Sequence, residues 1–168
     1  MEYILGKNDN EVKIDTADAY RETVISMTQQ AQHSIDIFTP DLESVIYNNI
    51  DIERAVLHLS KRHPDTRIRI LVQDSKKSVQ DGHCLIRLAQ RLTSSVFIHK
   101  PSREHKSETG AFVVVDQMGF IYRALAADRN YQAIFNFRSP RLAASQLEFF
   151  NEAWEHSTPD TQTRRIFL

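Results

Sequence analysis

The chain has 168 residues, of which 41% are hydrophobic and 26% are charged, and this composition excludes a disordered protein. Its formal net charge of −1 excludes a strong overall attraction to nucleic acid, although a local basic face is compatible with it. Cys84 is the only cysteine, which excludes an intrachain disulfide and favours a reducing compartment. Residues 1–7 show neither a long apolar run nor a basic leader, so we expect no secretion, and no run approaches the roughly 18–20 apolar residues that span a bilayer. We expect one soluble, cytoplasmic domain over residues 1–168.

Helical and strand patterns alternate along most of the chain, and strands cluster before the last helix. Apolar residues recur at helical spacing after Thr16, whereas residues 34–39 alternate as a strand that Pro40 ends. In chain order, the patterns predict an edge hairpin or edge strand at 1–14, a helix beginning at Asp15 or Thr16, a strand at 34–39, a loop at 41–49, a helix at 51–62, a strand at 67–72, a helix at 78–92, a strand at 95–99, a polar loop at 101–107, strands at 111–116, 119–123 and 132–137, and a helix that Ser139 caps. This order predicts an α/β fold, a mixed β-sheet with helices on both faces.

Two further details concern a turn and the end of the chain. We expect Gly119 to supply the unusual backbone dihedral of the tight turn that joins 111–116 to 119–123. We expect the polar tail at 157–168 to fray.

The order of the elements resembles one half of a phospholipase D-like enzyme over about residues 17–156. Residues 35–40 (Ile-Asp-Ile-Phe-Thr-Pro) and 67–72 (Arg-Ile-Arg-Ile-Leu-Val) are similar to two strands of that family. Residues 150–154 are similar to the Phe-x-x-x-Trp of the helix that closes its domain, and 111–116 (Ala-Phe-Val-Val-Val-Asp) resembles its signature strand. The resemblance implies a phospholipase D-like half as the fold.

The signature of that family is His-x-Lys, four further residues and Asp. Asp116 fits it, but Thr109 stands at the position of the histidine and Ala111 at that of the lysine. In the family, the histidine is a nucleophile that forms a covalent phospho-enzyme intermediate, and a second histidine from the other half protonates the leaving group. Its lysines bind the phosphate, and no metal is needed. Thr109 and Ala111 cannot replace the nucleophilic histidine and the phosphate-binding lysine, so the resemblance implies a catalytically inactive domain.

An alternative is that the protein is an active phosphodiesterase, nuclease or transferase whose catalytic site lies at other residues. His105 and Lys106 lie just upstream of the signature strand, and with Asp116 they are the candidate catalytic residues of a relocated site. Adjacent residues on a strand face opposite ways, so this pair replaces His-x-Lys only if a loop brings the two side chains together. The competing interpretation is a solvated charged loop for His105 and Lys106, and a turn-capping role for Asp116.

Candidate ligand-binding residues follow the signature strand. Arg123, Asn136 and Arg138 would rim the cleft of the family. A guanidinium binds phosphate through two parallel hydrogen bonds, so the two arginines are candidates to replace the missing lysine. The competing interpretation is a pair of arginines in surface salt bridges.

A second basic group is predicted on the helix at 78–92, where His83, Arg87 and Arg91 share one face. This face is either a phosphate or nucleic-acid contact or a polar stripe that faces solvent. The seven histidines show no His-x-x-x-His spacing and the four glycines do not cluster, so we predict no metal and no cofactor.

Three functions remain open. The first is an inactive phospholipase D-like domain that binds a phosphate-bearing ligand, nucleic acid included, or a protein partner. The second is a metal-independent phosphodiesterase, nuclease or transferase with the relocated site. The third is a structural module for dimerisation or interaction. The resemblance also implies a homodimer, since single-half members of the family pair across the cleft. No membrane insertion is expected.

Overall fold

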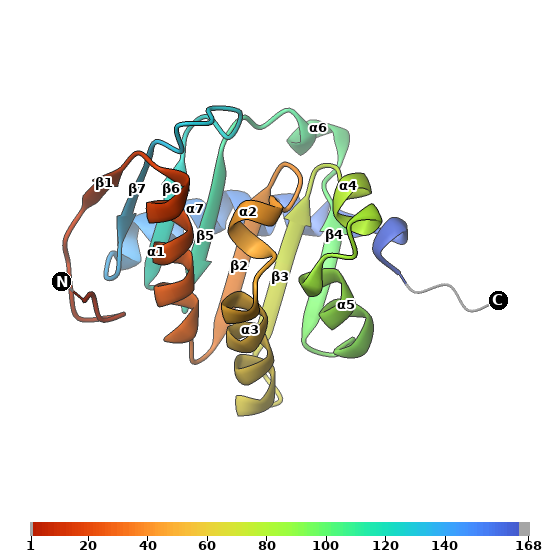
Figure 1. The fold of residues 1–168 in the computed structure, drawn as a ribbon, viewed down its shortest axis with the longest axis horizontal. Coiled ribbons are helices and arrows are strands. Elements are labelled where there is room, and N and C mark those ends of the chain that lie inside the picture. Colours follow the sequence, from red (N-terminus) through yellow and green to blue (C-terminus); the bar gives the residue numbers. More distant parts are fainter. Residues whose placement is uncertain (1, 165–168) are drawn as a thin grey trace.

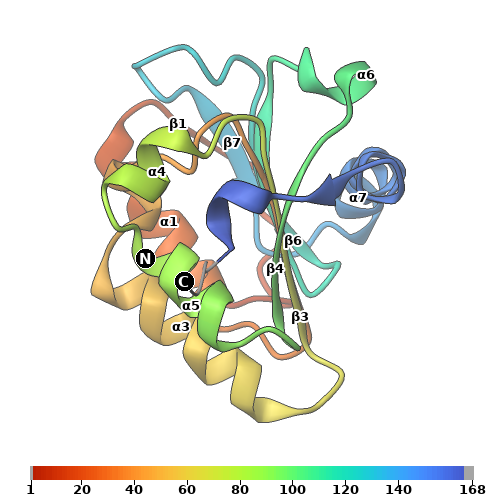
Figure 2. The ribbon, with the colours of Figure 1, turned by 90° about the vertical axis from the view of Figure 1, so that its right-hand side faces the viewer.

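The computed structural model describes residues 2–164 and shows one mixed sheet of eight strands with helices on both faces (Figures 1 and 2). The strand order is β1-β7-β6-β5-β2-β3-β4-β8; β2, β3 and β4 are parallel, and every other neighbouring pair is antiparallel. The strands are β1 Val12–Ile14, β2 Ser34–Thr39, β3 Arg67–Val72, β4 Val96–Lys100, β5 Ala111–Val115, β6 Gly119–Arg123, β7 Ala133–Asn136 and β8 Thr158–Pro159. The α/β fold predicted from the sequence is confirmed.

The helices cover the two faces unequally. They are α1 Ala17–Gln29, α2 Ser44–Tyr47, α3 Ile50–Arg62, α4 Lys76–Gln80, α5 Cys84–Arg91, α6 Arg103–Lys106 and α7 Pro140–Glu155, with a 3₁₀ turn η1 at Thr161–Thr163. Figure 2 shows α1, α3, α4 and α5 on one side of the sheet and α7 on the other. Among the described residues, no helix is long and apolar enough to cross a bilayer.

Each face of the sheet has its own hydrophobic core, because successive strand side chains point to opposite faces. Ile35 and Ile37 of β2 belong to the larger core under α1, α3 and α5. Phe38 belongs to the smaller core under α7. Asp36 shares that second face, and its carboxylate pairs with Arg69 at 2.8 Å. The alternation that predicted β2 from the sequence thus corresponds to the two faces of the sheet, although both faces of this strand are buried.

The predicted N-terminal ends of two long helices are confirmed. Thr16 caps α1, since its side-chain oxygen accepts the backbone N–H of Ala19 at 3.0 Å. Pro140 occupies the first turn of α7, after the cap residue Ser139. At 41–49, where a loop was predicted, the structure contains the single helical turn α2.

The helix predicted at 78–92 is instead two helices, α4 and α5. Gly82 has a φ of +66°, in the left-handed region that ends a helix, and His83 then caps α5 by accepting the N–H of Leu85 at 3.1 Å. His83 is fully buried, so the predicted basic face with Arg87 and Arg91 does not form. Burial lowers the pKa of His83 to about 4.

The turn between β5 and β6 has a different basis from the predicted one. Asp116 and Gln117 have φ values of +55° and +57°, whereas Gly119 has no positive φ. A Cβ on Gly119 would lie 2.7 Å from Cδ1 of Leu5, so the glycine serves close packing and not the turn dihedral. Aspartate is among the residues that adopt the left-handed region more often than most others.

The carboxylate of Asp116 joins this turn to the start of β2. It accepts the backbone N–H groups of Gln32, His33 and Ser34 at 2.7–3.1 Å. Gln32 and His33 directly precede β2 and Ser34 begins it, and the carboxylate satisfies the N–H groups of all three residues. The capping interpretation of Asp116 is confirmed by this geometry.

The ends of the chain agree with the prediction in part. Val12–Ile14 form the edge strand β1 against β7, which is one of the two predicted alternatives, and residues 2–11 contain no strand that pairs with it. Residues 158–163 of the predicted fraying tail add β8 to β4 and then form η1, and the end of the tail at 165–168 lies outside the described residues.

We predict that Asp116→Ala lowers the free energy of unfolding by roughly 3 kcal/mol, since hydrogen bonds to a charged acceptor contribute about 1.5–3 kcal/mol each. Urea denaturation at pH 7 measures the loss, with Asp65→Ala, an exposed carboxylate, as the control. An equal, small loss in both variants would contradict the capping role.

We predict that the buried neutral His83 makes the fold acid-sensitive. Its folded pKa of about 4 lies below the unfolded value of 6.5, so the unfolded state binds more protons between these pH values. Stability from this site is complete above pH 6.5 and falls as the pH drops toward 4. His83→Asn keeps a capping side chain without the titration. Urea denaturation from pH 7 to 4.5 should show a shallower loss in His83→Asn than in the wild type. The exposed-site variant His58→Asn should behave as the wild type does.

Candidate functional site

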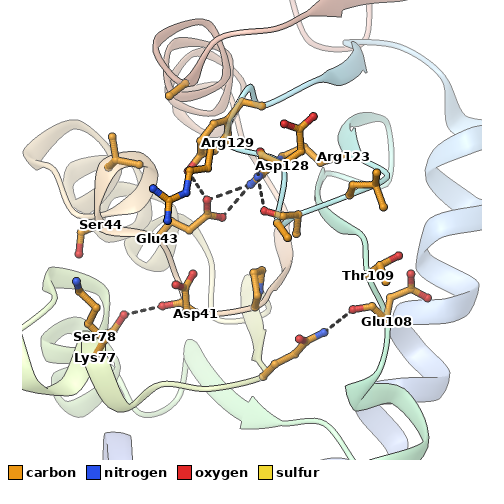
Figure 3. Close-up of a pocket in the computed structure, with 18 residues that line it drawn as sticks. Asp41, Glu43, Ser44, Lys77, Ser78, Glu108, Thr109, Arg123, Asp128 and Arg129 are labelled. Atoms are coloured by element: carbon orange, nitrogen blue, oxygen red, sulfur yellow. Dashed lines mark hydrogen bonds and ion pairs between the residues drawn. The ribbon is translucent and has the colours of Figure 1, made fainter.

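The edge of the sheet at which β2, β3 and β4 end, called the carboxyl edge below, is hollowed into a cleft of about 790 Å³. Its walls come from the loop after β2, the turn after β3 with α4, the residues before β5, and the loop between β6 and β7 (Figure 3). Open α/β sheets bind ligands at this edge, because their loops leave the sheet there. The cleft is lined by Ala17, Pro40, Asp41, Glu43, Ser44, Val45, Gln73, Lys77, Ser78, Glu108, Thr109, Arg123, Leu125, Ala126, Ala127, Asp128, Arg129 and Tyr131.

Arg123, the last residue of β6, is only 1% exposed and is paired inside the protein. Its Nη1 donates to both carboxylate oxygens of Glu43 at 3.0 Å, and its Nη2 donates to the carbonyls of Ala126 and Asp128 at 2.6 and 3.2 Å. The guanidinium carbon lies 3.9 Å from the ring centre of Tyr131. Only Nε has no acceptor among the described residues. The donors that phosphate binding would require are already occupied, contrary to the expectation.

Glu43 accepts hydrogen bonds from two residues of this network. The hydroxyl of Tyr131 donates to its carboxylate, so one acid receives an arginine and a tyrosine. Burial raises the pKa of Tyr131, and the hydrogen bond to Glu43 raises it further, which keeps the hydroxyl protonated. Tyr131 and Leu42 have φ values of +54° and +55°, so both segments are strained where they enclose the cleft.

The remaining charges give the cleft an acidic character. Its carboxylates are Asp41, Glu43, Glu108 and Asp128, and its cations are Lys77, Arg123 and Arg129. Since Glu43 and Arg123 neutralise each other, three carboxylates remain for two cations. Burial raises the pKa of Asp41 and the neighbouring Glu43 raises it further, while Lys77 and Arg123 partly offset the rise. Asp41 forms no ion pair with another described residue. Such a cleft favours a cationic group over a phosphate.

The two substituted signature positions lie at the cleft end of β5. Thr109 lines the cleft, and its hydroxyl donates to the carbonyl of Ala124 at 3.4 Å. Ala111 is 1% exposed inside the sheet. No histidine lines the cleft in the part of the chain that the structure describes.

The structure separates the three predicted ligand-binding residues. Arg123 lies at the carboxyl edge, whereas Asn136 pairs with Phe120 near the opposite edge, because β6 and β7 are antiparallel. The Asn136 amide donates to Asp9 at 2.9 Å, and its oxygen accepts the N–H of Arg138. Asn136 and Arg138 therefore do not rim the cleft. Sequence proximity misled the prediction because a strand reverses direction between them and Arg123.

The predicted relocated site does not assemble either. His105 is 6% exposed and packs against Phe149 of α7, with ring centres 5.6 Å apart. Lys106 lines a separate, smaller pocket. Asp116 follows the far end of β5, where it caps the start of β2. The short helix α6 therefore does not bring His105 and Lys106 together with Asp116.

Several lining residues were missed by the sequence analysis, above all Asp41, Glu43 and Lys77. A signal for two of them existed, since Asp41 and Glu43 directly follow a buried strand and Pro40, where the loops of a carboxyl edge begin. Among the described residues, no group of three or more His, Cys, Asp or Glu side chains is placed to hold a metal ion.

A family model described as a domain of unknown function (DUF7931) matches residues 16–166. The chain belongs to this family. None of the curated protein sequences compared with the chain matches it.

Solved structures similar to this chain include enzymes and a DNA-binding protein. TrmBL2, an archaeal chromatin protein with a novel mode of DNA binding, has 15% identity and a TM-score of 0.67, over 92% of this chain and 55% of TrmBL2. Nuc, a phospholipase D family member from Salmonella typhimurium, has 17% identity and a TM-score of 0.65, over 93% of this chain and 99% of Nuc. The phosphatidylserine synthase of Haemophilus influenzae has 11% identity and a TM-score of 0.61, over 95% of this chain and 41% of the synthase.

These identities show the fold alone. The chain spans about half of TrmBL2, less than half of the synthase and nearly all of Nuc. The predicted phospholipase D-like single-domain fold is thereby confirmed.

We predict that Arg123→Met lowers the free energy of unfolding by roughly 3–5 kcal/mol, because it leaves the carboxylate of Glu43 without its cation in a largely buried place. The double variant Arg123→Met with Glu43→Gln should lose less than the sum of the single changes. Urea denaturation measures the cycle, and Arg138→Met, an exposed arginine, should lie within about 0.5 kcal/mol of the wild type. Additive losses would show that the pair does not interact.

Proposed function

We propose that this protein is a non-catalytic phospholipase D-like domain whose cleft binds a protein partner through a basic side chain. One observation carries the proposal: the cleft end of β5 presents Thr109 and Ala111 where the resemblance requires a nucleophile and a phosphate-binding lysine. A threonine without an adjacent base is not an activated nucleophile, and a buried alanine binds no phosphate.

The chemistry of the cleft supports a protein partner. Leu125 and Val45 are 61% and 49% exposed on its rim. Exposed apolar side chains around a concave surface are typical of interaction sites. The exposed carboxylate of Asp41 also lines the cleft (Figure 3) and forms no ion pair with another described residue, so a lysine or arginine flanked by apolar residues is complementary to this lining.

The similarity to TrmBL2 shows that this fold is found in a protein that binds DNA. For the present chain, the acidic cleft opposes the approach of a polyanion. We therefore favour a protein over nucleic acid as the occupant of the cleft.

We predict no turnover of bis(p-nitrophenyl) phosphate by the pure protein in excess chelator. Metal-independent turnover that is lost in His105→Ala would overturn the proposal and establish a relocated catalytic site. Turnover that survives in His105→Ala would equally contradict a non-catalytic domain.

A binding experiment tests the partner chemistry. A short peptide with one lysine between leucines is titrated into ¹⁵N-labelled protein and compared with the same peptide carrying glutamate. We expect only the lysine peptide to shift the amide resonances around the cleft. Asp41→Asn should weaken its binding roughly 5-fold, a loss of about 1 kcal/mol. Leu125→Glu should also weaken it, whereas Ile4→Glu, which changes an exposed apolar residue outside the cleft, should not.

The homodimer implied by the resemblance stays a prediction, which sedimentation equilibrium measures. If Leu125→Glu converts a dimer into a monomer, the partner of the cleft is a second copy of the chain. If the dimer persists in Leu125→Glu and the lysine peptide still binds, the cleft serves another protein.

A further inference from the structure

A second, smaller pocket of about 260 Å³ lies at the carboxyl edge, beyond Gln73, which borders both this pocket and the cleft. Three segments enclose it: the turn after β3, the end of β4 with α6, and the C-terminal segment at 158–162. Figure 2 shows this C-terminal segment crossing the edge of the sheet from α7 to the side of α4 and α5. Residues far apart in the sequence are thus brought to one small cavity, which we call the lysine pocket.

Two lysines from different elements line the lysine pocket. Lys100 is the last residue of β4 and Lys106 is the last residue of α6. Neither forms an ion pair with another described residue. An ammonium group offers three donors and no acceptor, and two like charges at one cavity repel each other. An anion between them would relieve that repulsion.

The pocket also contains two carboxylates, whose hydrogen bonds are directed to the backbone. Asp74 accepts the N–H of Lys76, and Asp160 accepts the N–H of Gln162, both at 3.0 Å. Asp160 is only 5% exposed, so its carboxylate belongs to the wall more than to the open space. These two carboxylates thus stabilise the turns at 74–76 and 160–162, and they form no ion pair with Lys100 or Lys106.

Neutral donors complete the lining. Thr158 lies directly opposite Lys100 in the register of β8 and β4, and Thr161 begins η1. Hydroxyl groups donate readily to oxyanions alongside lysine. The site also lies beyond the ends of the parallel strands β3 and β4, which is where open α/β sheets receive ligands.

We propose that the lysine pocket binds the terminal phosphate of a small phosphate monoester through Lys100 and Lys106, with Thr158 and Thr161 as further donors. A monoester carries close to two negative charges at neutral pH, which matches two lysines better than the single charge of a diester. The enclosed volume accommodates a phosphate with a small substituent and not a duplex. This site is separate from the cleft and does not depend on the function proposed for it.

Ligand binding here should stabilise the fold. The C-terminal segment is joined to β4 by a short ladder, His99 with Pro159 and Lys100 with Thr158, and by the N–H of Asp160, which donates to the carbonyl of Ile98 at 3.1 Å. A phosphate held by α6 and β4 on one side and by the C-terminal segment on the other adds a link between them. Because the ligand binds the folded state alone, it raises the melting temperature by mass action.

The test is thermal unfolding of the full chain in inorganic phosphate and in sodium chloride at equal ionic strength. We expect a rise that grows with the logarithm of the phosphate concentration above the dissociation constant and reaches about 3–6 °C at ten times that constant. Lys100→Gln and Lys106→Gln should each lose most of this rise. Lys61→Gln, which changes an exposed lysine on α3, should keep it. The comparison uses the phosphate-dependent increment, so a change in the baseline stability of a variant does not affect it.

Two further arms identify the source of the phosphate. Glycerol phosphate, a monoester, should reproduce the rise, whereas dimethyl phosphate and a single-stranded oligonucleotide should not. An equal rise with the diester or the oligonucleotide would overturn the assignment to a small monoester. A rise that is absent, or that is unchanged in both lysine variants, would overturn the site itself. Leu125→Glu should leave the rise intact, so failure here is distinguishable from failure of the proposed cleft function.

Discussion

The ion pair between Arg123 and Glu43 is the interaction on which the shape of the cleft depends. It joins the end of β6 to the loop after β2, and its second nitrogen holds the carbonyls of Ala126 and Asp128 in the loop that follows β6. Burying two charges is costly unless each finds a partner and further hydrogen bonds. Here Tyr131 and two carbonyls supply those hydrogen bonds. The charged groups are therefore engaged inside the protein and are not free to bind a ligand.

This charged network also distinguishes the cleft from a phosphoryl-transfer site. A phosphoryl-transfer site needs cations whose donors are free and a nucleophile that an adjacent group activates. In this chain, the buried arginine is engaged by a carboxylate, and the signature positions hold Thr109 and Ala111. What remains is a concave, acidic surface with Leu125 and Val45 on its rim, whose properties suit recognition of a basic segment.

The carboxyl edge thus presents two cavities of different character on either side of Gln73. The cleft is acidic and has an apolar rim, whereas the lysine pocket is small and polar and carries Lys100 and Lys106. We propose that the acidic cleft receives a cationic protein segment, whereas the lysine pocket receives an anionic small molecule.

The class of fold and the order of most elements could be predicted from local patterns in the sequence. Strands such as 34–39 and 67–72 show alternating apolar residues, and Thr16 and Pro140 mark helix starts through local hydrogen bonding and ring geometry. Local patterns do not reveal which polar residues meet in the folded protein. The antiparallel direction of β6 and β7 places Arg123 and Asn136 at opposite edges of the sheet. Arg123 and His83 are buried inside the protein, although the sequence patterns were compatible with surface positions for both. Such contacts depend on residues dozens of positions apart, such as Glu43 and Arg123, and no local pattern in the sequence records that pairing.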